Sequence, residues 1–496
     1  MMSRRCSDSA WLGVDLGTQS VRAMLVSETG RVFGIGSHKL ASHRDGPRHE
    51  QNPQEWWSAT SIACRAALAA LPAGCNIAGV AVDGTSGTIL LVDGRGRPLT
   101  PGLMYDDNRA VEEVKRANEL GAPVWEMQGY NRMQASWGLP KLLWLLGHHG
   151  ARIAGTRLAH QSDFINCRLT GQAVATDTSN ALKTGVDLIG ERWPDRTFAD
   201  LGVPAEILPP VVRAGTVLGV VSPEAAKETD LPPGTTVVAG MTDGCAAQIG
   251  AGALSVGSWN SVLGTTLVLK GVSPTLIRDP AGVVYCHRSP DGNWLPGGAS
   301  STGAGAISKY FPERDLESMG ARAAERGPAG VVTYPLNGRG ERFPFIAQEA
   351  EGFTLGEPAD EIERYAAVLE GVAFIERLCF DYVDMLGAPI GGPIVFTGGG
   401  AKSWYWSQLR ANVLNRPVSL AENAEAAFGM AVLAAASGHR VANIAAKMVR
   451  VREVITPSQD NARQLSESFL RLVDELSRRG WLAPVVAHHA HRRTGA

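Results

Sequence analysis

The sequence has few cysteines and no long apolar stretch. Its seven cysteines are odd in number, and no two of them have C-x-x-C spacing. Disulfide frameworks and structural zinc sites use paired cysteines, so neither is expected, and a reducing compartment fits best. The apolar helical run from Leu142 to Leu146 is far shorter than the roughly 18 residues of a membrane span. No apolar signal core follows Arg4 and Arg5, so we expect a cytoplasmic protein that does not enter a membrane.

An excess of charge of either sign is also missing. The chain has 47 Lys and Arg against 49 Asp and Glu, and a formal net charge of −2. Nucleic-acid and membrane surfaces attract basic patches, so neither partner is expected. The one dense cationic stretch, His488 to Arg493, follows the last apolar segment, and we expect a solvated, disordered tail over 485–496.

Two common nucleotide-binding signatures are absent as well. The P-loop pattern G-x-x-x-x-G-K-[ST] does not occur, and no G-x-G-x-x-G follows the first predicted strand. A P-loop enzyme is therefore excluded, and a dinucleotide-binding domain of that kind is not expected. Any nucleotide site in this chain must use a different type of loop.

What the sequence does contain is a recurring order of strand, small-residue turn and strand. The strands predicted from apolar runs between turn residues are 11–14, 22–26, 32–35, 77–82, 88–92, 236–239, 258–262 and 267–270. Helices are predicted over 53–71, 360–386 and 424–437. Glycine and threonine hairpins at 15–20 and 264–266 each precede a set of strands and helices. The 496 residues therefore form a distant duplication of one α/β unit, with a boundary near residue 254.

Three of the turns suit a phosphate-binding role. Glycine lets the backbone N–H groups approach a ligand closely, and Ser or Thr adds hydroxyl donors. Residues 15–20 and 264–266 offer both, and 398–400 open a helix whose N-terminus favours anionic groups. Taken alone, each turn is more often an ordinary tight turn than a phosphate loop.

Taken together, the motifs resemble those of the FGGY carbohydrate kinases. The matching patterns in chain order are D-x-G-T-x-S at 15–20, T-D-G at 242–244, L-G-T-T at 263–266 and G-G-G-A-K-S-x-x-W at 398–406. The resemblance covers residues 11 to 440. It implies two duplicated ribonuclease-H-like α/β domains of the actin, hexokinase and Hsp70 superfamily around a central cleft. The expected domains are 1–254, which binds sugar and carries the catalytic Asp, and 255–484, which binds ATP.

The resemblance also implies the roles of individual residues. Asp243 would be the general base, and Asp15 would hold Mg²⁺ through water. The residues expected to bind ATP are Gly17, Thr18, Ser20, Gly264, Thr265, Thr266, Gly303, Ser308, Gly399, Gly400, Ala401, Lys402 and Ser403. The residues expected to contact the sugar are Asp15, Asp83, Ser86, Gly87, Asp107 and Asp243.

The chemistry of phosphoryl transfer agrees with these roles. A sugar hydroxyl does not ionise at neutral pH, and a carboxylate at hydrogen-bond distance can accept its proton as the new bond forms. Asp243 could instead cap the helix that follows it, because Asp caps helices well, and the two roles are compatible. Asp83 is open to a second interpretation as a turn residue. Cys245 has no sequence sign of a base partner, so we expect a small buried residue rather than a nucleophile.

The sugar is indicated by the turn at 84–87. Glycerol kinases carry an Arg-Glu pair in this turn and bacterial xylulokinases carry G-Q-M-H-G, whereas this chain has Gly84-Thr-Ser-Gly87. This turn and Tyr105-Asp-Asp-Asn108 look more like those of D-ribulose kinases, so the expected reaction makes D-ribulose 5-phosphate. D-xylulose, or another pentulose or pentitol, is the alternative. A non-catalytic protein that responds to sugar or nucleotide is an alternative of another class. The oligomeric state stays open, with a homodimer among the choices.

Overall fold

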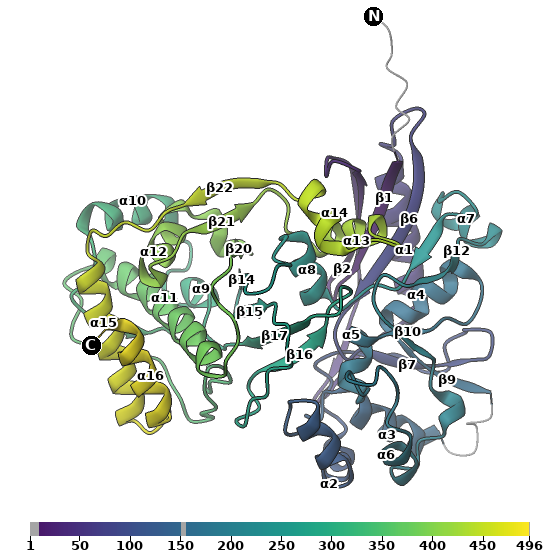
Figure 1. Cartoon of the computed structure of the whole chain (residues 1–496), viewed down its shortest axis with the longest axis horizontal. Coiled ribbons are helices and arrows are strands. Elements are labelled where there is room, and N and C mark those ends of the chain that lie inside the picture. The colour runs from purple at the N-terminus through teal and green to yellow at the C-terminus, as the bar shows by residue number, and fades with distance from the viewer. Residues whose placement is uncertain (1–8, 150–154, 496) are drawn as a thin grey trace, which may run out of the picture. The chain divides into compact units, whose positions relative to one another are not determined.

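The computed structural model describes residues 9–149 and 155–495, which fall into two compact units (Figure 1). Unit 1 contains the chain up to Gly252, together with His287–Asn293 and Asn423–Arg450. Unit 2 contains Ala253–Cys286, Trp294–Glu422 and the chain from Val451 onward. The first break lies within two residues of the boundary expected near 254.

Unit 1 is built on a six-stranded sheet with the order β12-β13-β6-β1-β2-β3. The bounds of these strands are β1 Ser9–Leu16, β2 Ser20–Ser27, β3 Val32–Lys39, β6 Asn76–Gly84, β12 Val217–Val220 and β13 Thr236–Val238. Strands β1, β2 and β3 pair antiparallel, β6 lies parallel to β1, and β13 lies parallel to β6. Strand β12 closes the far edge antiparallel to β13.

Unit 2 is built on a seven-stranded sheet with the order β16-β17-β15-β14-β20-β21-β22. The bounds of these strands are β14 Trp259–Leu263, β15 Leu267–Gly271, β16 Tyr285–Arg288, β17 Trp294–Ala299, β20 Ile394–Thr397, β21 Val418–Ala421 and β22 Val451–Ile455. The last two residues of β16, His287 and Arg288, are assigned to unit 1. Strands β14, β15 and β17 pair antiparallel, β20 and β21 continue parallel, and β22 is antiparallel to β21.

The two sheets repeat one topology. Strands β1, β2, β3, β6, β13 and β12 of unit 1 have the same order and directions as β14, β15, β17, β20, β21 and β22 of unit 2. The turn between β1 and β2 therefore corresponds to the turn between β14 and β15. The duplicated α/β architecture predicted from the two glycine-threonine hairpins is confirmed.

Helices pack on both faces of the unit 1 sheet. Leu12 and Val14 of β1 join the buried core with Trp56 of α1 (Pro53–Leu68). Gly13 points to the opposite face, because successive residues of a strand alternate. A Cβ at Gly13 would lie 1.8 Å from the carbonyl oxygen of Ala427 in α13 (Ala426–Ala435), so α13 rests directly on the backbone of β1.

Helix α13 shows where the sequence-based domain assignment differs from the structure. It was expected in the domain 255–484, but its segment, Asn423–Arg450, belongs to unit 1. There α13 lies beside β1 and α8 (Asp243–Gly250) (Figure 1). A Cβ at Gly429 would lie 1.9 Å from the carbonyl oxygen of Ala246 in α8, so only a small residue permits this contact.

The tail expected to be disordered over 485–496 is instead a helix as far as the structure describes it. Helix α16 (Pro484–Thr494) packs on α11 (Glu361–Met385) and buries Val486, Ala487 and Ala490. Arg493 pairs with Asp381 at 2.8 Å and with Asp384 at 2.5 Å. The expectation was wrong because the carboxylates that match the tail's cations lie more than 100 residues earlier in the chain.

The remaining elements complete the two units. Those of unit 1 are β4 His43–Asp45, β5 Arg48–Gln51, β7 Ile89–Asp93, β8 Gly102–Leu103, β9 Thr156–His160, β10 Thr176–Asp177, β11 Val211–Val212, α2 Val111–Met127, α3 Gly138–His149, α4 Gln161–Thr170, α5 Thr178–Ala181, α6 Asp195–Asp200, α7 Pro223–Thr229 and α14 Val441–Met448. Those of unit 2 are β18 Val332–Tyr334, β19 Phe353–Leu355, α9 Gly305–Tyr310, α10 Leu316–Arg326, α12 Trp404–Leu414 and α15 Ala462–Arg478. Over the described residues, we find no helix with the length and apolar character needed to cross a bilayer.

Candidate active site

Three carboxylates come together at one edge of the unit 1 sheet. Asp15 and Asp83 are register partners near the carboxyl ends of the parallel strands β1 and β6. Asp243 is the first residue of α8, and the preceding Thr242 forms a bridge with Gly84 at the end of β6. The three aspartates predicted at separate points of the sequence therefore belong to one cluster, because the carboxyl ends of parallel strands share an edge.

The carboxylates of this cluster perturb one another. Burial, reinforced by the charge of Asp243, raises the pKa of Asp15 to about 6. Burial also raises the pKa of Asp83 well above its usual range, and the charges of Asp15 and Asp243 add to that effect. Burial and neighbouring like charges both disfavour the ionised form of a carboxyl group. Such clustered and shifted acids are typical of functional sites.

A cation would fit beside these carboxylates, because it would offset their mutual repulsion. Among the described residues there is no group of three or more Asp, Glu, His or Cys side chains close enough to hold a metal ion directly. The role of Asp15 in holding Mg²⁺ through water stays a prediction. Retention of several waters is characteristic of Mg²⁺ in phosphate-transfer sites.

Asp243 is exposed at the start of its helix. Its Oδ1 accepts a hydrogen bond from the Gly244 N–H at 2.7 Å. The N-cap position of α8 belongs to Thr242, so Asp243 is not itself the cap that the alternative interpretation required. An exposed carboxylate at the edge of the cluster has the access that a proton acceptor needs.

Each predicted phosphate loop is closed by a backbone hydrogen bond from its first glycine, over four residues in unit 1 and three in unit 2. In unit 1, the Gly17 N–H donates to the Ser20 carbonyl at 3.1 Å, and the Gln51 side chain holds the Thr18 carbonyl at 2.7 Å. In unit 2, the Gly264 N–H donates to the Thr266 carbonyl, also at 3.1 Å. Gly303 packs against this second loop, since a Cβ there would lie 2.5 Å from the Cα of Thr266.

Unit 2 contains a cavity of about 690 Å³ beside the glycine-rich turn that follows β20. Predicted nucleotide residues that line it are Ser308, Gly399, Gly400, Lys402 and Ser403. The side chain of Ser403 also caps α12 by accepting a hydrogen bond from the Trp406 N–H. Predicted residues Gly303 and Ala401 are not part of its wall, although their neighbours Ala304 and Gly400 are.

Sequence reasoning missed the opposite wall of this cavity. It consists of Leu316, Glu317, Gly320 and Ala321 of α10, Tyr365 of α11, and Trp404, Tyr405 and Trp406 of α12. Helix α10 reads as an ordinary amphipathic helix, so no motif in it signals a ligand. The trailing W of the G-G-G-A-K-S-x-x-W pattern was the only available hint.

The turn expected to contact the sugar has one unused hydroxyl. Both the N–H and the hydroxyl of Thr85 donate to Gln161 Oε1, at 2.9 and 2.8 Å. Ser86 Oγ, in contrast, is buried without a hydrogen-bond partner. Gly87 has φ = +91°, and a Cβ there would lie 3.1 Å from Cδ of Lys183. Ser86 thus suits a ligand hydroxyl better than Thr85 does.

Lys183 and Gln161 beside this turn were not found from the sequence. Lys183 Nζ lies 3.3 Å from the Ser86 carbonyl, and Gln161 Nε2 is buried without a partner. Both residues reach the turn from elements more than 70 residues away in the chain. No local pattern could have identified them.

Asp107, also predicted to contact the sugar, is fully engaged by the protein. It accepts hydrogen bonds from the His49 N–H at 2.7 Å and from the Arg109 guanidinium at 2.7 Å, and it is buried. Its neighbour Asp106 is half-buried and bonds to His49 Nδ1 and Arg44. The role of Asp107 as a sugar ligand stays a prediction. In the structure, its carboxylate holds the His49 backbone and the Arg109 side chain in place.

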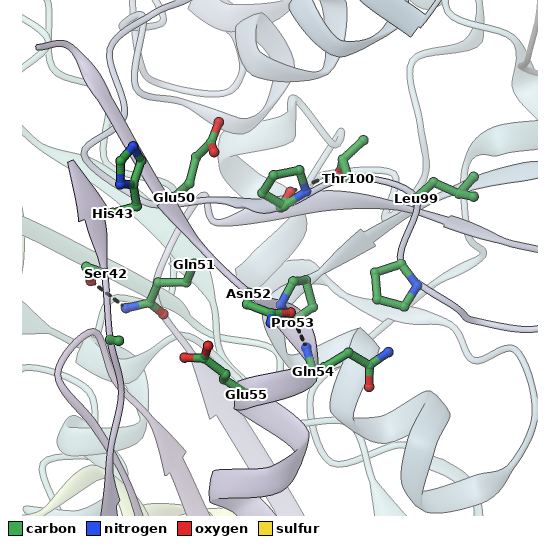
Figure 2. A pocket seen from close by; sticks show the side chains of 13 residues that line it. Ser42, His43, Glu50, Gln51, Asn52, Pro53, Gln54, Glu55, Leu99 and Thr100 are labelled. Carbon is green, nitrogen blue, oxygen red and sulfur yellow. Dashed lines mark hydrogen bonds between the residues drawn. The ribbon is translucent and has the colours of Figure 1, made fainter. Parts of the chain in front are cut away.

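Another cavity, of about 600 Å³, lies in unit 1, where the β4–β5 hairpin meets the start of α1. Figure 2 shows Gln51 in its wall, donating to Ser42. The same side-chain nitrogen donates to the Thr18 carbonyl of the first phosphate loop. The cavity is thus connected to that loop by one residue, but none of the predicted site residues lines it.

Comparison with known proteins identifies the fold and its family. The N-terminal domain of the FGGY family of carbohydrate kinases matches residues 10–250, and the C-terminal domain of that family matches residues 259–438. The chain belongs to the FGGY family. The predicted resemblance and fold class are therefore confirmed.

Individual proteins similar to this FGGY chain are carbohydrate kinases by name. A xylulose kinase from Streptomyces rubiginosus is 30% identical over 434 residues, which are 86% of this chain and 87% of that protein. A xylulose kinase from Klebsiella pneumoniae is 29% identical over 418 residues, 81% of this chain and 84% of that protein. The structure of a protein described as a xyloylose kinase from Brucella ovis aligns with a TM-score of 0.85 at 27% identity, covering 93% of this chain and 97% of that one.

Proposed function

We propose that this FGGY kinase transfers the γ-phosphate of ATP to a hydroxyl of a ketopentose, with Asp243 as the general base. The observation that carries this proposal is the cluster of Asp15, Asp83 and the exposed Asp243 at one edge of the unit 1 sheet. A pure binding module has no need for an exposed carboxylate beside the buried Asp83 and the half-buried Asp15.

The acceptor half of the reaction belongs to unit 1. Asp243 accepts the proton of the attacking hydroxyl as the bond to phosphorus forms, which general bases do at hydrogen-bond distance. Ser86 Oγ bonds a second hydroxyl of the sugar, since it is buried and has no partner in the protein. Asp15 would hold a hydrated Mg²⁺, and the bound ion would neutralise charge on the phosphates.

The nucleotide half belongs to unit 2. The turn at Gly264 to Thr266 offers N–H and hydroxyl donors to the terminal phosphates, and the cavity of about 690 Å³ takes the adenosine. Gly399 and Gly400 leave room for the ligand at the start of a helical turn. The first loop, Gly17, Thr18 and Ser20, supplies further donors to the transferred phosphate.

Two ketopentoses compete as the natural substrate. The composition of the turn at 84–87 supports D-ribulose, whereas the relatives named xylulose kinase support D-xylulose at least as strongly. Discrimination depends on which hydroxyl meets Ser86, because a site that hydrogen-bonds a hydroxyl strongly rejects an isomer that misplaces it.

A coupled ADP-release assay over ketopentoses, pentitols, gluconate and glycerol tests the proposal. We expect sugar-dependent ADP release with D-ribulose or D-xylulose and little with glycerol. Sugar binding measured by calorimetry without ADP release from any of these compounds would refute the kinase and favour a sugar-responsive binding protein.

A further inference from the structure

Three buried polar side chains meet directly behind the start of α8 in unit 1. They are Ser179 of α5, Thr242 and His287, and each is at most 2% exposed. Ser179 Oγ lies 3.0 Å from Thr242 Oγ1 and 3.0 Å from His287 Nδ1. It also accepts a hydrogen bond from the Thr242 N–H at 3.2 Å.

The hydroxyl of Ser179 is saturated by these neighbours. A serine hydroxyl has one proton and two lone pairs. One lone pair receives the Thr242 N–H, and the proton and the other lone pair serve Thr242 Oγ1 and His287 Nδ1 in either order. Whichever tautomer His287 adopts, all three contacts are satisfied, so the position of Thr242 relative to Ser179 is closely fixed.

The backbone of Ser179 is held by Asp177, the N-cap of α5. The Ser179 N–H donates to Asp177 Oδ1 at 2.8 Å, as does the Asn180 N–H at 2.9 Å. Asn180 Nδ2 donates to Asp177 Oδ2 at 2.7 Å. These bonds cap the start of the short helix α5 (Thr178–Ala181), so Ser179 links the position of α5 to that of Thr242.

Thr242 is the residue before Asp243 and the N-cap of α8, yet its side chain makes no capping bond to the helix. Its hydroxyl is directed instead to Ser179. Ser179 therefore helps to hold the helix start in place, together with the bridge between Gly84 and Thr242 and the backbone bonds that the Thr242 carbonyl accepts from Cys245 and Ala246. A shift of Thr242 moves the Asp243 carboxylate with it, since the two residues share a peptide unit.

We propose that Ser179 and His287 are positioning residues for Asp243. This inference rests on the proposed function, in which Asp243 is the general base. Neither residue touches the substrate. Their contacts hold Thr242, and through it the carboxylate, at the distance that proton transfer requires. Misplacement of a reacting group by 1 Å can cost about 100-fold in rate.

Ser179→Ala is the primary test, with Ser61→Ala as its matched control. Ser61 is also a buried serine of unit 1, but its Oγ has no hydrogen-bond partner. We expect Ser179→Ala to lower kcat about 10- to 100-fold, with the KM for sugar and for ATP unchanged. Ser61→Ala should keep full turnover. An unchanged kcat in Ser179→Ala overturns the proposal.

His287 provides a second pair of variants, in case Ser179→Ala does not fold. His287→Ala removes the partner of Ser179, whereas His287→Asn can return a polar atom near the place of Nδ1. We expect kcat to fall in His287→Ala and to recover substantially in His287→Asn. Equal loss in both variants, or a change in KM alone, would contradict a positioning role.

The double variant separates positioning from a general structural effect. In the Asp243→Asn background there is no base left to position, so Ser179→Ala should cause no further loss beyond about twofold. If Ser179→Ala lowers kcat by the same factor in the wild type and in Asp243→Asn, the proposal is overturned. Full turnover of Asp243→Asn would instead refute the proposed function, and loss in Asp243→Asn with none in Ser179→Ala would refute this inference alone.

Discussion

Gly303 is the position where one added methyl group should damage nucleotide handling in a calculable way. An alanine Cβ there would lie 2.5 Å from the Cα of Thr266 and 2.6 Å from the carbonyl oxygen of Thr265. Carbon atoms in contact prefer about 3.5–4.0 Å, so the second phosphate loop must move by about 1 Å. Both obstructing atoms belong to the backbone and cannot rotate away.

This displacement gives a prediction for Gly303→Ala. Overpacking of this kind costs about 1–3 kcal/mol of stability. Displacement of phosphate donors by about 1 Å should lower kcat/KM for ATP by about 10- to 100-fold. The KM for the sugar should not change, because the sugar residues belong to unit 1.

Steady-state kinetics with each substrate varied in turn, alongside thermal melting, measures these quantities. Gly391→Ala is the matched control, since a Cβ at Gly391 meets nothing within 4 Å. Gly303→Ala with wild-type kcat/KM for ATP would refute the assignment of the Gly264 to Thr266 turn as a phosphate loop. An equal fall in kcat/KM for ATP in Gly391→Ala would mean that the effect comes from lost stability rather than from the phosphate loop.

Three further predictions concern the sugar turn, a buried acid and the C-terminal helix. Ser86→Ala should raise the KM for the sugar about 5- to 50-fold without loss of stability, because the lost hydroxyl has no protein partner; an unchanged KM would remove Ser86 from the sugar site. Burial raises the pKa of Glu370 from 4.5 to about 8, so its stabilising contribution is complete below pH 4.5 and is lost as the pH rises to about 8. The free energy of unfolding of Glu370→Gln, measured with denaturant, should therefore exceed that of the wild type by a few kcal/mol at pH 8.5 and equal it at pH 4.5. A difference that does not depend on pH would contradict this. Arg493→Ala should lower the free energy of unfolding by about 1–3 kcal/mol, because it leaves the buried Asp381 with a weaker partner. Its control is Arg463→Ala, which breaks an exposed ion pair and should leave the melting temperature unchanged.

The sequence contained enough to predict the cluster at the edge of the unit 1 sheet. Asp15 and Asp83 each follow an apolar strand, and Asp243 follows another. The resemblance to the FGGY kinases singled out these three residues, and their convergence follows from the rule that parallel strands end at one edge. The duplicated hairpins were predictable because glycine and threonine turns between strands are local signals.

What the sequence did not reveal depends on partners far away in the chain. The C-terminal helix α16 is held by Asp381 and Asp384, and α13 joins unit 1 through contacts with β1 and α8. His287 reaches Ser179 across 108 residues. Local composition marks Arg493 as a solvated cation and His287 as an isolated histidine, because neither pattern contains its partner.

The most direct test of the account is the turnover of Asp243→Asn with the preferred ketopentose in the coupled ADP-release assay. This substitution keeps the size of the side chain and its Oδ1 contact with the Gly244 N–H, but it removes the proton acceptor. We expect a fall in kcat of about 10²- to 10⁴-fold with little change in KM for either substrate. Full turnover of this variant, or wild-type enzyme that releases no ADP with any ketopentose, would contradict it.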